Sequence, residues 1–184
     1  MSYENNPGNE ELKIKQYELT ADNPELAIDG RDADIIDNNG CIAELTLGES
    51  ENGKLWLYID QLEDGNKELI VLNGNSKADA DRFFSTSANP GEVVRAHFAF
   101  IKPGQETHIG RTAENLGRRL GLSKDETISR DHMSILLTEE GYVIFRDHSL
   151  NGTSVAVGEH TRRVVLNAQQ EMGRLAVEPP VIER

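Results

Sequence analysis

The chain has 184 residues and a formal net charge of −13 at pH 7. That length suits one domain with extensions or two very small domains, and an acidic surface repels polyanions, which argues against nucleic-acid binding. No run approaches the roughly 20 apolar residues of a membrane span, and the polar start MSYENNPGNE does not resemble a signal peptide. We therefore expect a soluble, cytoplasmic protein that contacts no membrane.

The first 40 residues are predicted to form an acidic, flexible arm. Polar and turn-forming stretches such as ENNPGNEE, DGRDAD and DNNG dominate this segment, and aromatic residues are scarce. A segment of this composition has little apolar surface to bury and is expected to have at most local structure. We therefore assign residues 1–40 to an N-terminal extension.

From residue 41 the chain changes to short runs rich in β-branched and aromatic residues. CIAELTL, KLWLYID, KELIVL and EVVRAHFAFI are separated by the turn sequences GESENG, EDGN and SANPG. KLWLYID alternates, so we expect one face to carry Leu55, Leu57 and Ile59 and the other Trp56 and Tyr58. These runs predict β-strands.

The strand pattern continues through ETHIG, HMSILLT, YVIF, TSVAV, RRVVL and MGRLAV. The short sequence 139–141 between HMSILLT and YVIF predicts a hairpin, and only 77–84 and 114–120 could hold a helical turn or two. Many short strands with frequent turn signals are typical of an antiparallel sandwich. We expect an all-β fold, an antiparallel β-sandwich of about eleven strands over residues 41–180.

Three loop motifs follow this pattern in order. They are Gly110-Arg111 in HIGR, the sequence SRDH from Ser129 to His132, and the sequence DHSLNGT from Asp147 to Thr153. Each motif alone is common, but all three in order between hydrophobic strands are specific. In these motifs the chain resembles the forkhead-associated (FHA) family, which gathers a Gly-Arg, a Ser-Arg-x-His and an Asp-x-Ser-x-Asn-Gly-Thr at one end of a β-sandwich.

The resemblance covers mainly residues 95–157. The loop between Arg111 and Ser129 is a few residues longer than is usual in the family, and the match thins after Val157, where the expected Gly-Asp turn is missing. It implies a phosphothreonine-binding module that acts downstream of a Ser/Thr kinase, binds a phosphothreonine-containing peptide or protein, and is not an enzyme.

The chemistry of the motif residues suits a phosphate ligand. A phosphothreonine carries nearly two negative charges and several acceptor oxygens, so its receptor needs a guanidinium fork and neutral donors. The resemblance implies that the phosphopeptide is contacted by Arg111, Ser129, Arg130 and Asn151. It implies structural support of the binding loops by Gly110, His132, Gly152 and Thr153.

The charge distribution is consistent with an anion site in this region. Residues 1–90 carry 19 acidic and 7 basic residues, whereas residues 91–184 carry 13 and 12. Within 111–130 the basic residues outnumber the acidic ones; they are Arg111, Arg118, Arg119, Lys124 and Arg130. Ordinary ion pairing on a solvated loop would explain the same excess.

Other functions have weaker support. An FHA-like domain that binds its partner without phosphate remains the main alternative. A hydrolase triad of Ser129, His132 and Asp147 lacks a nucleophile elbow. Cys41 is the single cysteine and the five histidines lack zinc-like spacing, so we expect no metal and no cofactor, although weak calcium binding by the acidic half stays open.

Thr20 gives a further hypothesis. It is the only threonine in residues 1–40, and some proteins of the FHA family fold a phosphorylated arm back onto their own binding face. A mobile arm of this length could deliver such a threonine at high effective concentration. An inert tail is the simpler interpretation.

Overall fold

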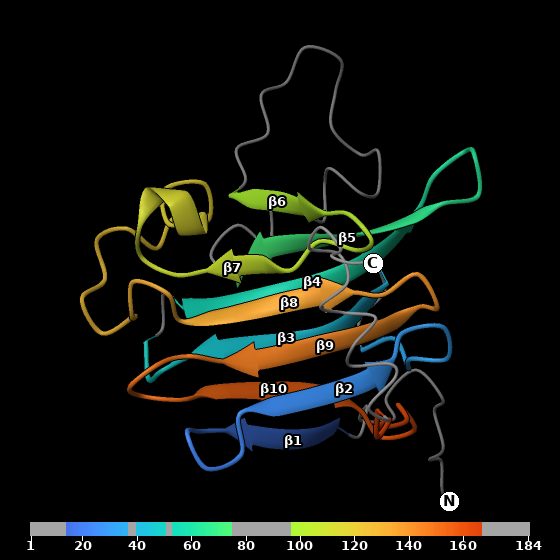
Figure 1. The fold of residues 1–184 in the computed structure, drawn as a ribbon, viewed down its shortest axis with the longest axis horizontal. Coiled ribbons are helices and arrows are strands. Elements are labelled where there is room, and N and C mark those ends of the chain that lie inside the picture. Colours follow the sequence, from blue (N-terminus) through green and yellow to red (C-terminus); the bar gives the residue numbers. More distant parts are fainter. Residues whose placement is uncertain (1–13, 37–39, 51–52, 75–96, 167–184) are drawn as a thin grey trace, which may run out of the picture.

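The computed structural model describes residues 14–36, 40–50, 53–74 and 97–166. These residues form ten β-strands and one short 3₁₀ helix, η4, with no α-helix among them (Figure 1). The elements are β1 (Ile14–Leu19), β2 (Glu25–Asp29), β3 (Cys41–Leu47), β4 (Lys54–Gln61), β5 (Lys67–Asn73), β6 (Phe98–Ile101), β7 (Thr107–Ile109), η4 (Ala113–Asn115), β8 (Met133–Leu137), β9 (Tyr142–Asp147) and β10 (Thr153–Gly158).

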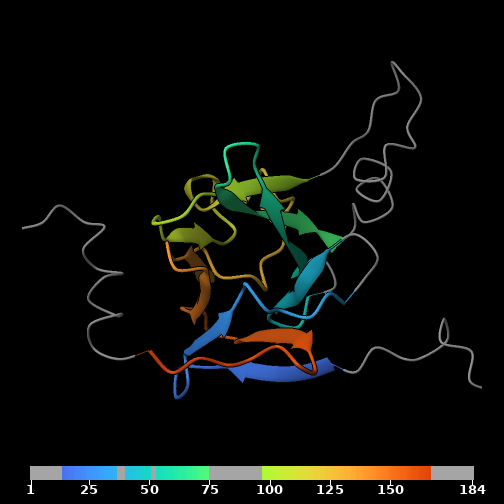
Figure 2. The same ribbon diagram turned by 90° about the vertical axis from the view of Figure 1, so that its right-hand side faces the viewer.

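The strands make two antiparallel sheets. The six-stranded sheet has the order β1-β10-β3-β4-β5-β6, and the four-stranded sheet has the order β2-β9-β8-β7. Figure 2 shows the two sheets from their end, with the chain passing between them several times. The all-β class and the sandwich arrangement predicted from the sequence are confirmed, with ten strands in the described part of the chain where about eleven were expected.

The main core lies between the two sheets. Alternate residues of each strand point into it, such as Leu55 and Leu57 from β4 and Val143 and Phe145 from β9, all of which are fully buried. Trp56 and Tyr58 lie on the outer face of β4, in a second cluster. The alternation predicted for KLWLYID is therefore confirmed. So is the hairpin of β8 and β9, which is closed by a turn at 138–141.

The prediction of a flexible arm through residue 40 is wrong for residues 14–29. Strand β1 pairs with β10 over six residues at the edge of one sheet, and β2 pairs with β9 over five residues at the edge of the other. Leu19, Leu26 and Ile28 are buried in the main core. Gln16 and Glu18 of β1 are exposed on an edge strand, which is why the sequence of β1 looks like a solvated segment.

Thr20 lies in the turn between β1 and β2, not on a mobile arm. Its N–H donates to the carbonyl of Asn23 (3.2 Å), and the N–H of Asn23 donates back to the carbonyl of Thr20 (3.1 Å). A threonine held in this turn cannot swing back as the sequence hypothesis requires. The hypothesis that a mobile arm delivers Thr20 to the binding face is therefore wrong.

The segment after β10 lies along β2. Asp29 N–H donates to Arg162 O (3.0 Å), Val164 N–H donates to Ala27 O (2.8 Å), and a single β-bridge joins Ile28 to Arg163. The predicted strand in RRVVL is thus reduced to one bridge. The predicted strand in MGRLAV and the predicted helical turn at 77–84 lie outside the described residues. The helical turn predicted at 114–120 overlaps the end of η4, which stops at Asn115.

None of the helical segments in the described part of the chain has the length and hydropathy needed to cross a membrane.

Candidate functional site

All three sequence motifs lie at one end of the sandwich. Ile109 at the end of β7 pairs with Met133 at the start of β8, and Met133 pairs with Asp147 at the end of β9. The loops that follow or precede these residues must therefore meet at the same end, which is on the left in Figure 1. The β1–β2 turn and the β3–β4 connection reach this end too, because Thr153 pairs with both Leu19 and Leu47.

Gly110 permits two of the loops to touch. A Cβ at this position would collide with the carbonyl oxygen of Arg130, so no other residue fits without moving the backbone. The next residue, Arg111, donates its backbone N–H to Ser129 O (3.0 Å). The first motif is thus fixed directly against the second.

The guanidinium of Arg111 is held at one edge only. Its Nε donates to the carbonyl oxygen of Ile128 (3.0 Å), and no carboxylate among the described residues forms an ion pair with it. The two terminal nitrogens of the fork therefore carry donors with no described partner. A side chain oriented in this way can present a cationic, bidentate donor pair to an oxyanion.

Ser129 offers a neutral donor close to the same place. Its Oγ accepts the backbone N–H of Leu150 (3.3 Å), which leaves the hydroxyl hydrogen available to a ligand. Arg130 has an exposed side chain, while its carbonyl oxygen accepts the amide of Asn115 (2.9 Å). Arg130 thus contributes to loop structure through its backbone, and its guanidinium remains at the surface.

His132 joins the second motif to the third. Its ring is fully buried; Nδ1 accepts the N–H of Ser129 (3.0 Å), so Nε2 carries the hydrogen and donates to Gly152 O (2.8 Å). Burial lowers the pKa of His132, in agreement with this neutral tautomer. His132 therefore supports the second and third loops, and neither of its ring nitrogens is free to bind a ligand.

The third motif is an internally bonded loop. The buried carboxylate of Asp147 accepts the hydroxyls of Ser149 (2.6 Å) and Thr153 (2.8 Å), and Ser149 Oγ accepts the N–H of Gly152 (2.7 Å). Gly152 has a φ of 86°, a conformation that favours glycine. The loop is therefore shaped before any ligand arrives.

Asn151 is exposed at the tip of this loop. One hydrogen of its amide nitrogen is donated to Thr127 O (3.1 Å), which ties the third motif to the segment before the second. The amide oxygen and the second amide hydrogen have no partner among the described residues. Asn151 can therefore still donate one hydrogen bond and accept others, as recognition of a peptide backbone requires.

The long connection between Arg111 and Ser129 is anchored to the core. Leu120, Leu122 and Ile128 are fully buried in the main core, and the carbonyl of Leu120 accepts the side-chain amide of Asn73. Three cationic side chains of this connection are exposed, those of Arg118, Arg119 and Lys124, and none forms an ion pair with a described residue. The ion-pairing explanation of the local arginine excess therefore finds no support in this part of the chain.

The comparisons with known proteins find no match. No protein-family model, no curated protein and no solved structure is significantly similar to the chain. The likeness to the FHA family thus rests on the three motifs, and the description of the site rests on its geometry.

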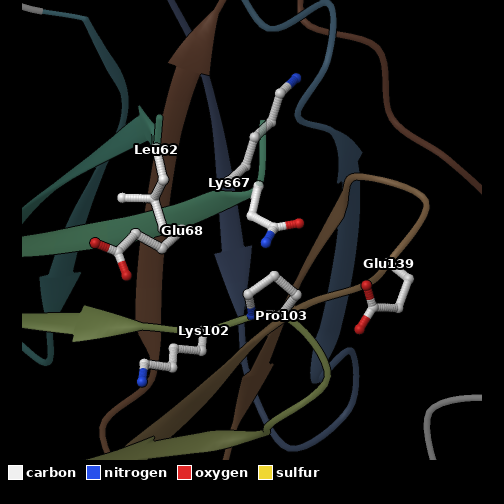
Figure 3. A pocket seen from close by; sticks show the side chains of 7 residues that line it. Leu62, Lys67, Glu68, Lys102, Pro103 and Glu139 are labelled. Atoms are coloured by element: carbon white, nitrogen blue, oxygen red, sulfur yellow. The ribbon is translucent and has the colours of Figure 1, made fainter. Parts of the chain in front are cut away.

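Two hollows in the described surface lie at the opposite end of the sandwich. One, of about 380 Å³, is lined by the β4–β5 turn, the β6–β7 turn and Glu139 of the β8–β9 turn (Figure 3). A second, of about 260 Å³, adjoins it near Arg31 and Gly141. The first hollow mixes Lys67 and Lys102 with Glu68 and Glu139, so it has no single charge that would select a ligand.

Several residues of the motif end were not assigned from the sequence. Gly48, with a φ of 63°, donates its N–H to Gly152 O (2.9 Å). A glycine directly after a strand predicts a turn, and nothing in the sequence indicated this contact. Asp147 and Ser149 organise the third loop, and the Asp-x-Ser spacing within the motif was the signal that could have assigned them. The contact of Thr127 with Asn151 joins residues 24 positions apart and has no sequence signature.

Proposed function

We propose that the protein is a phosphothreonine-dependent peptide- or protein-binding module that acts downstream of a Ser/Thr kinase. The observation that carries the proposal is the combination at one loop end of the Arg111 fork, the Ser129 hydroxyl and the Asn151 amide. Each keeps free hydrogen-bonding capacity while a bond to a neighbouring loop fixes it in place. Preorganised donors of this kind lose little conformational entropy on binding.

The roles within the proposed site follow from charge and reach. Arg111 donates two hydrogen bonds to the phosphate, and the Ser129 hydroxyl adds a neutral donor without further charge. Asn151 holds the main chain of the peptide on the far side of the phosphothreonine. Arg130 and the exposed cations of the 112–128 connection belong to the same loops, and their positive charge is expected to attract an acidic ligand.

Leu150 favours a second candidate function. This side chain is 95% exposed at the tip of the third loop, beside Asn151. An apolar anchor in this position could give affinity for a partner that carries no phosphate. The protein would then be an FHA-like interaction domain that uses the same loops without the Arg111 contact.

A peptide-library experiment separates the two functions. The protein is used to select from a degenerate phosphothreonine library and from its unphosphorylated twin, followed by titration of the selected sequences. We expect selection only from the phosphorylated library, with dissociation constants in the micromolar range, about −8 kcal/mol. Equal recovery from both libraries would reject phosphate dependence, and loss of that binding in Leu150→Ala would support the second candidate.

A further inference from the structure

Two histidines and an aspartate meet beside the recognition loops although they are far apart in sequence. His108 lies on β7, Asp131 precedes β8, and His148 follows β9. The antiparallel register places His108 opposite Ser134 of β8 and places Met133 opposite Asp147 of β9. The three side chains therefore converge at the surface of the four-stranded sheet, where sequence spacing alone gave no sign of a metal site.

The contacts within this group are close. His108 Nδ1 lies 3.0 Å and 3.1 Å from the two carboxylate oxygens of Asp131. The imidazole rings of His108 and His148 stack with their centroids 5.3 Å apart and their planes 21° from parallel. One nitrogen or oxygen atom from each of the three residues lies within 4.8 Å of the others.

We propose that His108, Asp131 and His148 form a binding site for a divalent transition metal ion, with Zn²⁺ as the representative ligand. Imidazole nitrogen and carboxylate oxygen bind Zn²⁺ at about 2.0–2.2 Å, which places ligand atoms of a tetrahedral site roughly 3.3 Å apart. The pair formed by His108 and Asp131 is already close to this separation. His148 is exposed, so its ring can turn out of the stack on His108 and direct a nitrogen at the same ion.

The surroundings of the two histidines resemble the outer shell of a metal site. Nε2 of His108 lies 3.6 Å from Glu106 Oε2, and Nε2 of His148 lies 3.1 Å from the hydroxyl of the buried Ser134. Metal-bound histidines usually have such a polar partner, which orients the ring. Glu106 and Asp131 also give the site negative charge on a protein that already carries −13, which attracts a cation.

Three protein ligands leave coordination positions open to solvent. Sites of this composition are typical of Zn²⁺ and of other borderline metals, whereas Ca²⁺ and Mg²⁺ prefer oxygen ligands alone. The bound ion would connect the loop before β8 to the loop after β9 through Asp131 and His148. Metal binding at this place does not require that the neighbouring loops bind a phosphopeptide.

Calorimetric titration of the untagged protein with ZnCl₂, in a buffer without phosphate, tests the site. We expect one equivalent to bind with micromolar affinity, and we expect His148→Ala and Asp131→Asn each to weaken binding at least tenfold. His160→Ala is the matched control, because His160 is an exposed histidine next to a glutamate, Glu159, outside the cluster. Its affinity should equal that of the wild type.

Co²⁺ provides a second measurement that does not depend on heat signals. A one-equivalent Co²⁺ complex should show visible absorption bands that Zn²⁺ abolishes and that are missing in His148→Ala, with melting temperatures confirming that the metal-free variants are folded. The proposal is overturned if no one-equivalent binding is observed. It is also overturned if the variants of the cluster bind like the wild type, or if His160→Ala loses binding.

Discussion

At one end of the sandwich Arg31 and Arg162 both bind the buried carboxylate of Asp29, whereas at the opposite end Arg111 contacts only a carbonyl oxygen. Arg31 donates from Nε (2.9 Å) and from a terminal nitrogen (2.9 Å), and Arg162 adds a third bond (3.1 Å). Hydrogen bonds from the Arg31 side chain hold the pKa of Asp29 well below its usual range.

The difference between the two ends shows how the same residue type can serve the fold or a ligand. The arginines beside Asp29 compensate a charge that the fold has buried, so their removal should affect stability. Arg111 compensates no charge among the described residues, so its removal should affect stability little. The contrast can be tested by substitutions and ligands, taken here from the largest to the smallest expected change in the free energy of unfolding or of binding.

The largest effect is expected at the Asp29 end. Arg31→Ala combined with Arg162→Ala leaves the fully buried Asp29 without a cation, which should lower the free energy of unfolding by about 3–5 kcal/mol. Denaturant unfolding measures the change. Arg118→Ala with Arg119→Ala is the matched control and should cost less than about 1 kcal/mol; equal losses in both pairs would contradict the contrast.

Next in size is the loss expected for His132→Ala. The substitution removes a buried ring and its bonds to Ser129 and Gly152, which should destabilise the protein by about 2–4 kcal/mol. It should also weaken phosphopeptide binding, because the second and third loops lose their connection. His160→Ala, at an exposed histidine, should leave both quantities unchanged in the same assays.

The pH dependence of stability tests the buried state of His132. Its pKa is lowered by burial, so below the unfolded value of about 6.5 the unfolded chain binds more protons than the folded one. This contribution to stability is therefore complete above about pH 6.5 and is lost as the pH falls, by at most about 1.4 kcal/mol per pH unit. The free energy of unfolding, measured at several pH values between 7 and 5, should depend less on pH in His132→Ala than in the wild type. An equal pH dependence in the two proteins would show that His132 does not have a lowered pKa in the folded state.

A smaller difference is expected between phosphothreonine and phosphoserine. The FHA resemblance implies a small pocket for the threonine methyl group near the Asn-Gly-Thr turn, and burial of one methyl group contributes about 1 kcal/mol. Paired titrations of otherwise identical peptides should therefore favour phosphothreonine by several-fold. Indistinguishable affinities would show that this pocket is absent from the motif end.

The strands with clear alternation were predictable, and the two edge strands within residues 14–29 were not. In β4, aliphatic and aromatic side chains alternate along an apolar run. The hairpin of β8 and β9 has a short turn between two apolar runs. Strand β1 exposes most of its polar residues at a sheet edge, and β2 ends in Asp29, whose burial depends on two arginines that the fold supplies. The sequence of neither strand contains the partner that stabilises it.

The candidate site shows the same division. The motifs predicted which loops meet at one end of the sandwich, because each motif is local in sequence. The bond from Asn151 to Thr127 and the group formed by His108, Asp131 and His148 depend on how strands far apart in sequence are aligned. Such contacts follow from the register of the sheets, which no short motif specifies.

The most direct test of the proposed function is titration of a selected phosphothreonine peptide, and of its unphosphorylated twin, into the wild type and into Arg111→Ala. Arg162→Ala, at the opposite end of the sandwich, is the control. We predict micromolar binding of the phosphopeptide to the wild type and to the control, no binding of the unphosphorylated twin, and at least a hundredfold weaker binding to Arg111→Ala with nearly unchanged unfolding. Equal affinity of the wild type for both peptides, or full binding by Arg111→Ala, would contradict the proposal.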